Sequence, residues 1–258
     1  MPLGSSVALP LPDGRVLVNT RIGGRDRIML AALGKDVAPF IDTQEQTAQP
    51  LALVGDALVA LTMGTDANRT IALASIANRR IIRRLEGAKG MVFDTMVASP
   101  DGRTLYFAAA GSIWSIPVDD GTPKQLRKGD SVTIDPYRNQ LIVRLTGIEG
   151  TRLVRQPLAG GPEQPIVLTS GLPLAPWQVW STAVARDGTI IVPLASPESW
   201  FWPLGVIDPN TGRTRVLDLG RKDSDMAGGW TSDGKILINA MGLRSTMWRF
   251  VPVRVAAE

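Results

Sequence analysis

The sequence predicts an all-β fold, a six-bladed β-propeller built from four-stranded antiparallel blades. Three observations favour it: a turn motif recurs along the chain, short apolar runs flank each copy, and no stretch has a sustained helical period. Six units fill the 258 residues, at roughly 43 residues a unit. Repeats of about 40–45 residues are typical of propeller blades, whereas a sandwich or closed barrel requires no such repeat.

The turn motif is clearest at Pro100-Asp101-Gly102, which stands just before the apolar run Leu105–Phe107. Asp-Gly between two apolar runs indicates a hairpin, because glycine accepts positive φ and aspartate tolerates the turn. Weaker copies contain Gly55-Asp56 and Asp135-Pro136. The other clear copies are Pro12-Asp13-Gly14, Arg186-Asp187-Gly188 and Ser232-Asp233-Gly234. We expect the aspartates of this motif to form turns and to carry no chemistry.

We predict one domain over residues 1–258. Its six units run over about 7–41, 50–85, 94–127, 130–168, 179–219 and 227–253. The last unit ends after its third expected strand, because the chain stops shortly after Val253. We therefore expect an imperfectly closed ring, a last blade without its outer strand, or a chain that is a piece of a longer protein.

Histidine and cysteine are both absent from the sequence. Their absence excludes Ser-His-Asp and Cys-His nucleophilic mechanisms, histidine-ligated metals and disulfides. Oxygen-ligated Ca²⁺ or Mg²⁺ stays open, although most aspartates already have expected turn roles. The loop expected at Asp223-Ser224-Asp225-Met226 is a weak metal candidate, since no further ligands lie near it in the sequence. We predict no metal and no cofactor.

The net charge of +4 is modest. The densest basic cluster, Arg79 to Arg84, is expected to straddle a third-to-fourth strand turn and to face solvent, which discourages edge-to-edge aggregation. Because the arginines do not gather with aromatic residues on one face, we expect no nucleic-acid binding. No apolar run approaches the roughly 18 residues of a membrane span, and no signal peptide is visible, so we expect no membrane contact by this domain.

Four of the seven tryptophans fall in two long connections of the fifth unit. Residues 172–180 lead into this unit and residues 195–203 join its second and third strands, so both are expected on the propeller face that most often carries binding sites. Rigid aromatic anchors favour a binding surface; alternatively, they only pack the loops onto the blade. The candidate binding residues are Trp177, Trp180, Trp200, Phe201, Trp202, Arg25 and Arg244. The two arginines suit a carboxylate or phosphate, or ordinary surface ion pairs.

The stretch Val97-Ala98-Ser99-Pro100-Asp101-Gly102, with Ile113-Trp114-Ser115 after it, resembles the TolB-type, WD-like β-propeller repeat. The resemblance is strong in the third unit, fair in the first, fifth and sixth, and poor in the other two. Residues 229–237 and 245–250 also resemble the C-terminal propeller of some bacterial transmembrane serine/threonine kinases. The resemblance implies an extracytoplasmic or periplasmic sensor or interaction module of a larger signalling protein, without catalytic residues.

We therefore predict a noncatalytic binding or sensor propeller that takes a protein partner or a small ligand on its loop face. The alternative is a propeller-class metal-dependent hydrolase or lactonase with Ca²⁺ in the central channel. That enzyme requires acidic and amide groups on the innermost strands, whereas the expected innermost strands are apolar or small. They are residues 7–9, 51–53, 97–98, 132–134, 183–185 and 228–230.

Overall fold

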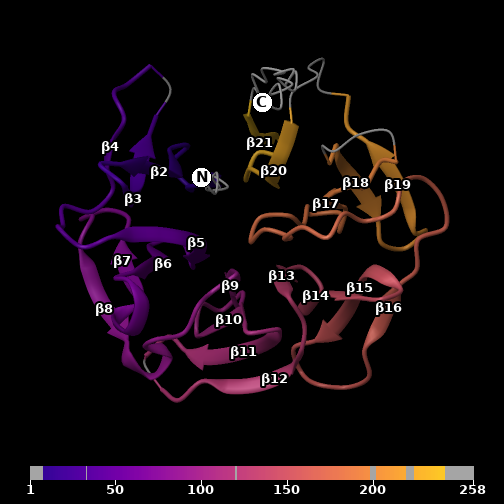
Figure 1. Cartoon of the computed structure of the whole chain (residues 1–258), viewed down its shortest axis with the longest axis horizontal. Helices are drawn as coiled ribbons and strands as arrows, with labels where there is room; N and C mark the ends of the chain where they lie inside the picture. Colours follow the sequence, from indigo (N-terminus) through magenta and orange to yellow (C-terminus); the bar gives the residue numbers. More distant parts are fainter. Residues whose placement is uncertain (1–7, 33, 120, 198–201, 219–223, 242–258) are drawn as a thin grey trace, which may run out of the picture.

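In the computed structural model the chain is a β-propeller with five evenly spaced blades and a partial sixth sheet arranged in a ring (Figure 1). The structure describes residues 8–32, 34–119, 121–197, 202–218 and 224–241. Within these ranges the helical segments are two 3₁₀ turns, Asp66–Asn68 and Glu86–Ala88. No helix in the described ranges is long and apolar enough to cross a bilayer.

The first four blades each contain four consecutive antiparallel strands, as the repeat predicts. The first comprises β1 (Ala8–Pro10), β2 (Val16–Ile22), β3 (Arg25–Ala31) and β4 (Ala38–Pro39). The second comprises β5 (Thr47–Val54), β6 (Leu58–Met63), β7 (Thr70–Ser75) and β8 (Ile81–Leu85). The third comprises β9 (Thr95–Ala98), β10 (Thr104–Ala109), β11 (Ser112–Pro117) and β12 (Lys124–Lys128). The fourth comprises β13 (Ser131–Asp135), β14 (Gln140–Gly147), β15 (Gly150–Pro157) and β16 (Gln164–Ile166).

The fifth blade has three strands, β17 (Ile190–Pro193), β18 (Leu204–Asp208) and β19 (Arg213–Val216). The sixth sheet is described as two strands, β20 (Ser224–Trp230) and β21 (Ile236–Met241), and β20 contacts both β17 and β1. The rest of the sixth unit lies outside the described residues. The loop expected at 223–226 is wrong over its last three residues, because these belong to β20. Ser224 and Asp225 pair with β21, Met226 lies at a register shift, and Asp223 lies outside the described residues.

The hydrophobic core lies between neighbouring blades, because side chains of successive residues in a strand point to opposite faces of the sheet. In β10, Leu105 and Phe107 pack in the cluster shared with the second blade. Ala108 packs in the cluster shared with the fourth blade. The Phe107 ring meets Phe93 edge to face, with ring centroids 5.3 Å apart. The second to fifth blades each bury both faces in this way, and burial of this apolar surface drives the blades to assemble.

The aspartates of the repeated motif form turns, which confirms their predicted role. Asp101 Oδ1 accepts the Arg103 N–H at 3.1 Å, and Asp187 Oδ1 accepts the Thr189 N–H at 2.8 Å. Asp233 accepts hydrogen bonds from Lys235 Nζ and the Thr231 hydroxyl, which lower the pKa of its carboxyl to about 2. These carboxylates hold the chain reversals of the scaffold.

The basic cluster also lies as predicted. Arg79 and Arg80 fall in the exposed turn between β7 and β8, and Arg83 is exposed on the outer strand β8. Arg84 Nη1 donates to Glu45 Oε2 at 2.9 Å. This hydrogen bond lowers the pKa of Glu45 and satisfies one of the arginines at the blade edge.

Candidate functional site

The central channel is crossed by residues 179–182, which we call the channel segment. The Ser181 hydroxyl donates to the Leu51 carbonyl in β5 at 3.0 Å. Ser131 Oγ in β13 accepts the Val179 N–H at 2.9 Å and donates to the Val179 carbonyl at 3.2 Å. The Thr182 carbonyl accepts the Trp230 N–H of β20 at 2.8 Å. The channel segment is thus tied to the second and fourth blades and to the sixth sheet, and Figure 1 shows the chain before β17 reaching the ring centre.

The innermost fifth strand predicted at residues 183–185 is present only as an isolated antiparallel bridge between Val184 and Ile190. On either side of this pair, the Ala183 carbonyl accepts the Ile191 N–H and the Ala185 N–H donates to the Thr189 carbonyl, each at 2.8 Å. The Ala183 N–H donates to the Trp180 carbonyl at 3.0 Å, and this turn takes the preceding residues out of the sheet. Pro173 and Pro176 lie just before it and supply no N–H to a sheet ladder. Residues 179–182, which precede this bridge, therefore lie outside the sheet and cross the channel.

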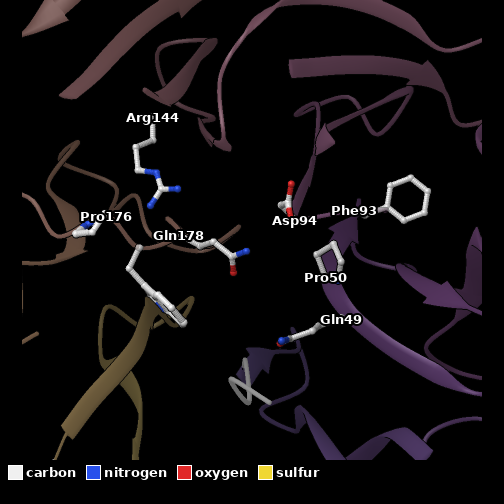
Figure 2. A pocket seen from close by; sticks show the side chains of 8 residues that line it. Gln49, Pro50, Phe93, Asp94, Arg144, Pro176 and Gln178 are labelled. Carbon is white, nitrogen blue, oxygen red and sulfur yellow. The ribbon is translucent and has the colours of Figure 1, made fainter. Parts of the chain in front are cut away.

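A cavity of about 360 Å³ opens beside this segment, near the ring axis (Figure 2). Its lining comes from inner strand β5, the residues before β9, strand β14 and the residues that lead into the channel segment. The lining residues are Gln49, Pro50, Phe93, Asp94, Arg144, Pro176, Trp177 and Gln178. The connections into the third and fifth blades contribute to it, so the cavity lies on the loop face where the sequence predicts binding.

A second cavity, of about 620 Å³, lies among the Asp-Gly hairpins that connect the first and second strands of the blades. Asp56, Tyr137 and Arg186 line it, together with Ser181 and Thr182 of the channel segment. The channel segment therefore lies between the two cavities. The larger cavity is lined by the turns that build the scaffold, and the smaller one by residues outside the repeated motif.

Arg144 is the buried cation of the smaller cavity. It lies in β14 and is 7% exposed. Its Nε donates to Asp130 Oδ1 at 2.6 Å, while Asp130 Oδ2 accepts the Thr146 N–H at 2.9 Å. Arg144 Nη1 is buried without a hydrogen-bond partner among the described residues. A buried polar group without a partner destabilises the folded state. An acceptor that hydrogen-bonds Arg144 Nη1 would remove this cost, and the described residues do not supply one.

Asp94 reaches the same cavity from the connection before β9. Its backbone N–H donates to the Ala108 carbonyl at 2.9 Å, which anchors it at the end of β10. Burial raises the pKa of the Asp94 carboxyl, and the negative charge of Asp130 raises it further, whereas Arg144 lowers it. Figure 2 shows the Asp94 carboxylate and the Arg144 guanidinium on different sides of the cavity. The cavity therefore offers one fixed cation and one carboxyl group with a raised pKa.

Three predicted tryptophans meet beside the cavity. The rings of Trp177 and Trp202 lie 5.2 Å apart between centroids, at an angle of 47°. Trp180 is 5% exposed and packs against Trp177. The indole nitrogens of Trp177 and Trp180 are buried without hydrogen-bond partners among the described residues. The two long connections thus converge as the sequence indicates, although Trp180 leaves little surface for a ligand.

The remaining predicted site residues do not join this group in the described structure. Arg25 is exposed at the start of β3 in the first blade, where its Nη1 lies 3.5 Å from the Gln44 carbonyl oxygen. Trp200, Phe201 and Arg244 lie outside the described residues.

Sequence reasoning missed Arg144, Asp94, Gln49 and Gln178. Two of them have a signal in the sequence. Arg144 follows directly on the apolar run Leu141-Ile142-Val143, so a charge stands among the buried residues of one strand. Asp94 stands before an innermost strand and outside any Asp-Gly turn. Charged residues next to buried strands, outside the repeated motif, were the useful indicators.

No protein-family model matches this chain, and no curated protein matches it in sequence. Solved structures do match. TolB from Acinetobacter baumannii has a TM-score of 0.61 at 13% identity over 81% of this chain and 56% of its own. A chain of the nidogen–laminin complex has a TM-score of 0.62 at 15% identity, over 88% of this chain and 85% of its own. The gluconolactonase XC5397 from Xanthomonas campestris has a TM-score of 0.63 at 14% identity, over 88% of this chain and 79% of its own. At these identities the likeness shows the β-propeller fold.

Proposed function

We propose that the chain is a noncatalytic binding propeller that takes its ligand at the smaller cavity. The observation that carries this proposal is Arg144, a nearly buried guanidinium with an unpartnered nitrogen that lines a cavity beside Trp177. Small-molecule sites are concave, and a few placed polar groups among apolar walls fix the ligand's orientation. Rigid blades hold these groups in place before the ligand arrives, which lowers the cost of binding.

The fold likeness to a gluconolactonase keeps a calcium-dependent hydrolase as the competing function. Gln49, Asp94 and Gln178 bring oxygen atoms to the cavity, and Ca²⁺ prefers such ligands. Arg144 lines the same cavity and disfavours a second cation there. Among the described residues, no three carboxylates gather into a group suited to a metal. This charge arrangement favours binding of a ligand with an acceptor group.

The binding function is tested by thermal denaturation of the full chain with a library of amino acids, sugars, nucleotides, dicarboxylates and short peptides. A ligand that binds the native state raises the melting temperature. We expect at least one class to do so, and the double variant W177A/W202A to lose that response. The variant Tyr137→Ala, at the opposite cavity, is the matched control and keeps it. The proposal fails if no compound raises the melting temperature, or if the double variant responds like the wild type.

The competing hydrolase is tested with calcium and δ-gluconolactone. We expect no turnover and no calcium-dependent rise in melting temperature. Lactone hydrolysis that Asp94→Asn abolishes would instead establish the enzyme.

We also propose that this propeller serves as the sensor module of a larger extracytoplasmic signalling protein, as the resemblance of its repeats implies. The neighbouring coding sequence tests this directly. A reading frame that continues into a membrane helix and a kinase domain supports it, and a frame without any further domain contradicts it.

A further inference from the structure

We propose that the smaller cavity binds a free α-amino acid, with the ligand carboxylate on Arg144, its ammonium group on Asp94 and its side chain beside Trp177. This inference rests on the proposed binding function and names the class of ligand. It follows from the donors, the charges and the size of the cavity.

The donors call for a carboxylate. Arg144 uses Nε for Asp130, so the ion pair fixes the guanidinium, and its Nη1 has no partner among the described residues. Arg144 Nη1 and Trp177 Nε1 are both buried without described partners, and both groups only donate hydrogen bonds. A carboxylate only accepts, and its two oxygens match the forked geometry of a guanidinium. Such charge-assisted bonds are stronger than those between neutral groups.

The charges call for an ammonium group on the same ligand. Arg144 contributes one positive charge, whereas Asp130 and Asp94 contribute two negative charges when ionised. A simple carboxylate would add a further negative charge close to Asp94, and a phosphate would add more. A ligand ammonium beside Asp94 cancels the charge of the ligand carboxylate. It also opposes the burial and the Asp130 charge that raise the pKa of Asp94.

The size and the walls of the cavity suit a single small molecule. Its volume of about 360 Å³ stands at the lower end of the roughly 300–1,000 Å³ of ligand pockets. Pro50, Pro176 and Trp177 supply apolar surface next to the charged groups. We therefore expect an apolar or aromatic amino acid to bind more tightly than a charged one.

The inference is tested by titration calorimetry of the full chain with each of the twenty L-amino acids. Leucine is then compared with two analogues: 4-methylpentanoate lacks the ammonium group, and 3-methylbutylamine lacks the carboxylate. We expect an apolar amino acid to bind and each leucine analogue to bind at least about tenfold more weakly than leucine, because each loses one charge-assisted contact.

Two variants assign the contacts. Arg144→Gln removes the group for the carboxylate, and Asp94→Asn removes the charge for the ammonium; we expect at least about tenfold weaker binding in each. The matched controls Arg186→Gln and Asp56→Asn change the same residue types at the opposite cavity and keep wild-type affinity. If Arg144→Gln does not fold, the affinity of Asp94→Asn still tests the inference. This variant keeps the side-chain size and removes a half-buried charge.

Three results would overturn the inference. They are equal binding of leucine and its two analogues, wild-type affinity in Asp94→Asn, and no binding of any amino acid at roughly 10 mM. If a sugar, nucleotide or other class binds in place of amino acids, the inference fails and the proposed binding function stands. If no ligand of any class binds, both fail.

Discussion

The third and fifth blades show what the repeat builds and what its interruption adds. In the third blade, four strands follow the motif around Pro100-Asp101-Gly102, and the innermost strand β9 pairs with β10 over four residue pairs. In the fifth blade, the Asp-Gly turn at Asp187 persists, but the inner strand is reduced to one bridge and residues 179–182 before it cross the channel. The same turn motif thus follows a regular inner strand in the third blade, whereas in the fifth blade the residues before it contact other sheets.

The difference teaches where specificity arises in a repeated scaffold. In the third blade, polar residues such as Asp101 form the turns, and apolar residues form the contacts between blades. The fifth blade lacks a full ladder of hydrogen bonds on its inner side. The channel segment instead forms hydrogen bonds to three other sheets. The residues that lead into this segment, Pro176 to Gln178, line the smaller cavity. Fold and site are therefore encoded in different parts of the repeat.

Phe107→Ala has the largest expected effect on stability, because it removes a fully buried ring of the third blade. We expect the free energy of unfolding to fall by about 3–5 kcal/mol, measured by denaturant unfolding. Trp202→Ala removes a larger side chain from a half-buried loop of the fifth blade and should cost less. The reverse order would contradict the assignment of scaffold and site to these two blades.

Ser131→Ala tests how strongly the channel segment is held. The change leaves the Val179 N–H and carbonyl without their side-chain partner, at a cost of about 2–3 kcal/mol in unfolding free energy. Ser112→Ala, which removes a hydroxyl from the third blade at its surface, should cost less than about 0.5 kcal/mol. Equal costs in denaturant unfolding would mean that the channel segment is not bound as described.

Gly229→Ala tests the junction of the channel segment with β20. A Cβ at this glycine would lie 1.9 Å from Thr182 Oγ1 and 3.0 Å from Thr182 Cβ, so the Thr182 side chain must rotate and the two segments must shift apart slightly. We expect a loss of about 1–2 kcal/mol, typical of overpacking. Gly147→Ala adds its methyl group where no atom lies within 4 Å and should be nearly neutral. A neutral Gly229→Ala would show that this close approach does not form.

Asp94→Asn has the smallest expected effect, and its sign is opposite. Burial raises the pKa of Asp94 above its ordinary value of 3.8, so its charged form destabilises the native state. That contribution to stability falls as pH rises from 3.8 through the raised pKa. Without ligand, we expect the variant to melt up to about 2 °C higher at pH 7. The difference should vanish below pH 3.8; a lower melting temperature at pH 7 would contradict the burial of this charge.

The fold could be predicted from the sequence because the motif repeats a local signal. Asp101-Gly102 and Asp187-Gly188 each need only their own turn geometry to form, so the blade count and the turn roles follow from short stretches of chain. The convergence of Trp177 and Trp202 also followed, since both connections belong to one face.

The candidate site could not be predicted in the same way. Arg144 and Asp94 lie 50 residues apart, in neighbouring blades, and line one cavity only after those blades pack together. The path of the channel segment depends on contacts of Ser181 with Leu51, at a sequence separation of 130. No local pattern encodes a contact of that range. The sequence shows a long connection with prolines at 173 and 176, but nothing in it says where that connection lies in the ring.

Amide hydrogen exchange of the full chain tests the central claim most directly, because it measures the channel segment without any ligand. The segment is not a strand, yet the Val179 N–H is bonded to a buried hydroxyl and the Ala183 N–H to a carbonyl. The amides of Val179 and Ala183 should exchange as slowly as those in β9 and β10 of the third blade. Exchange as fast as in the exposed loop at residues 159–163 would contradict the account.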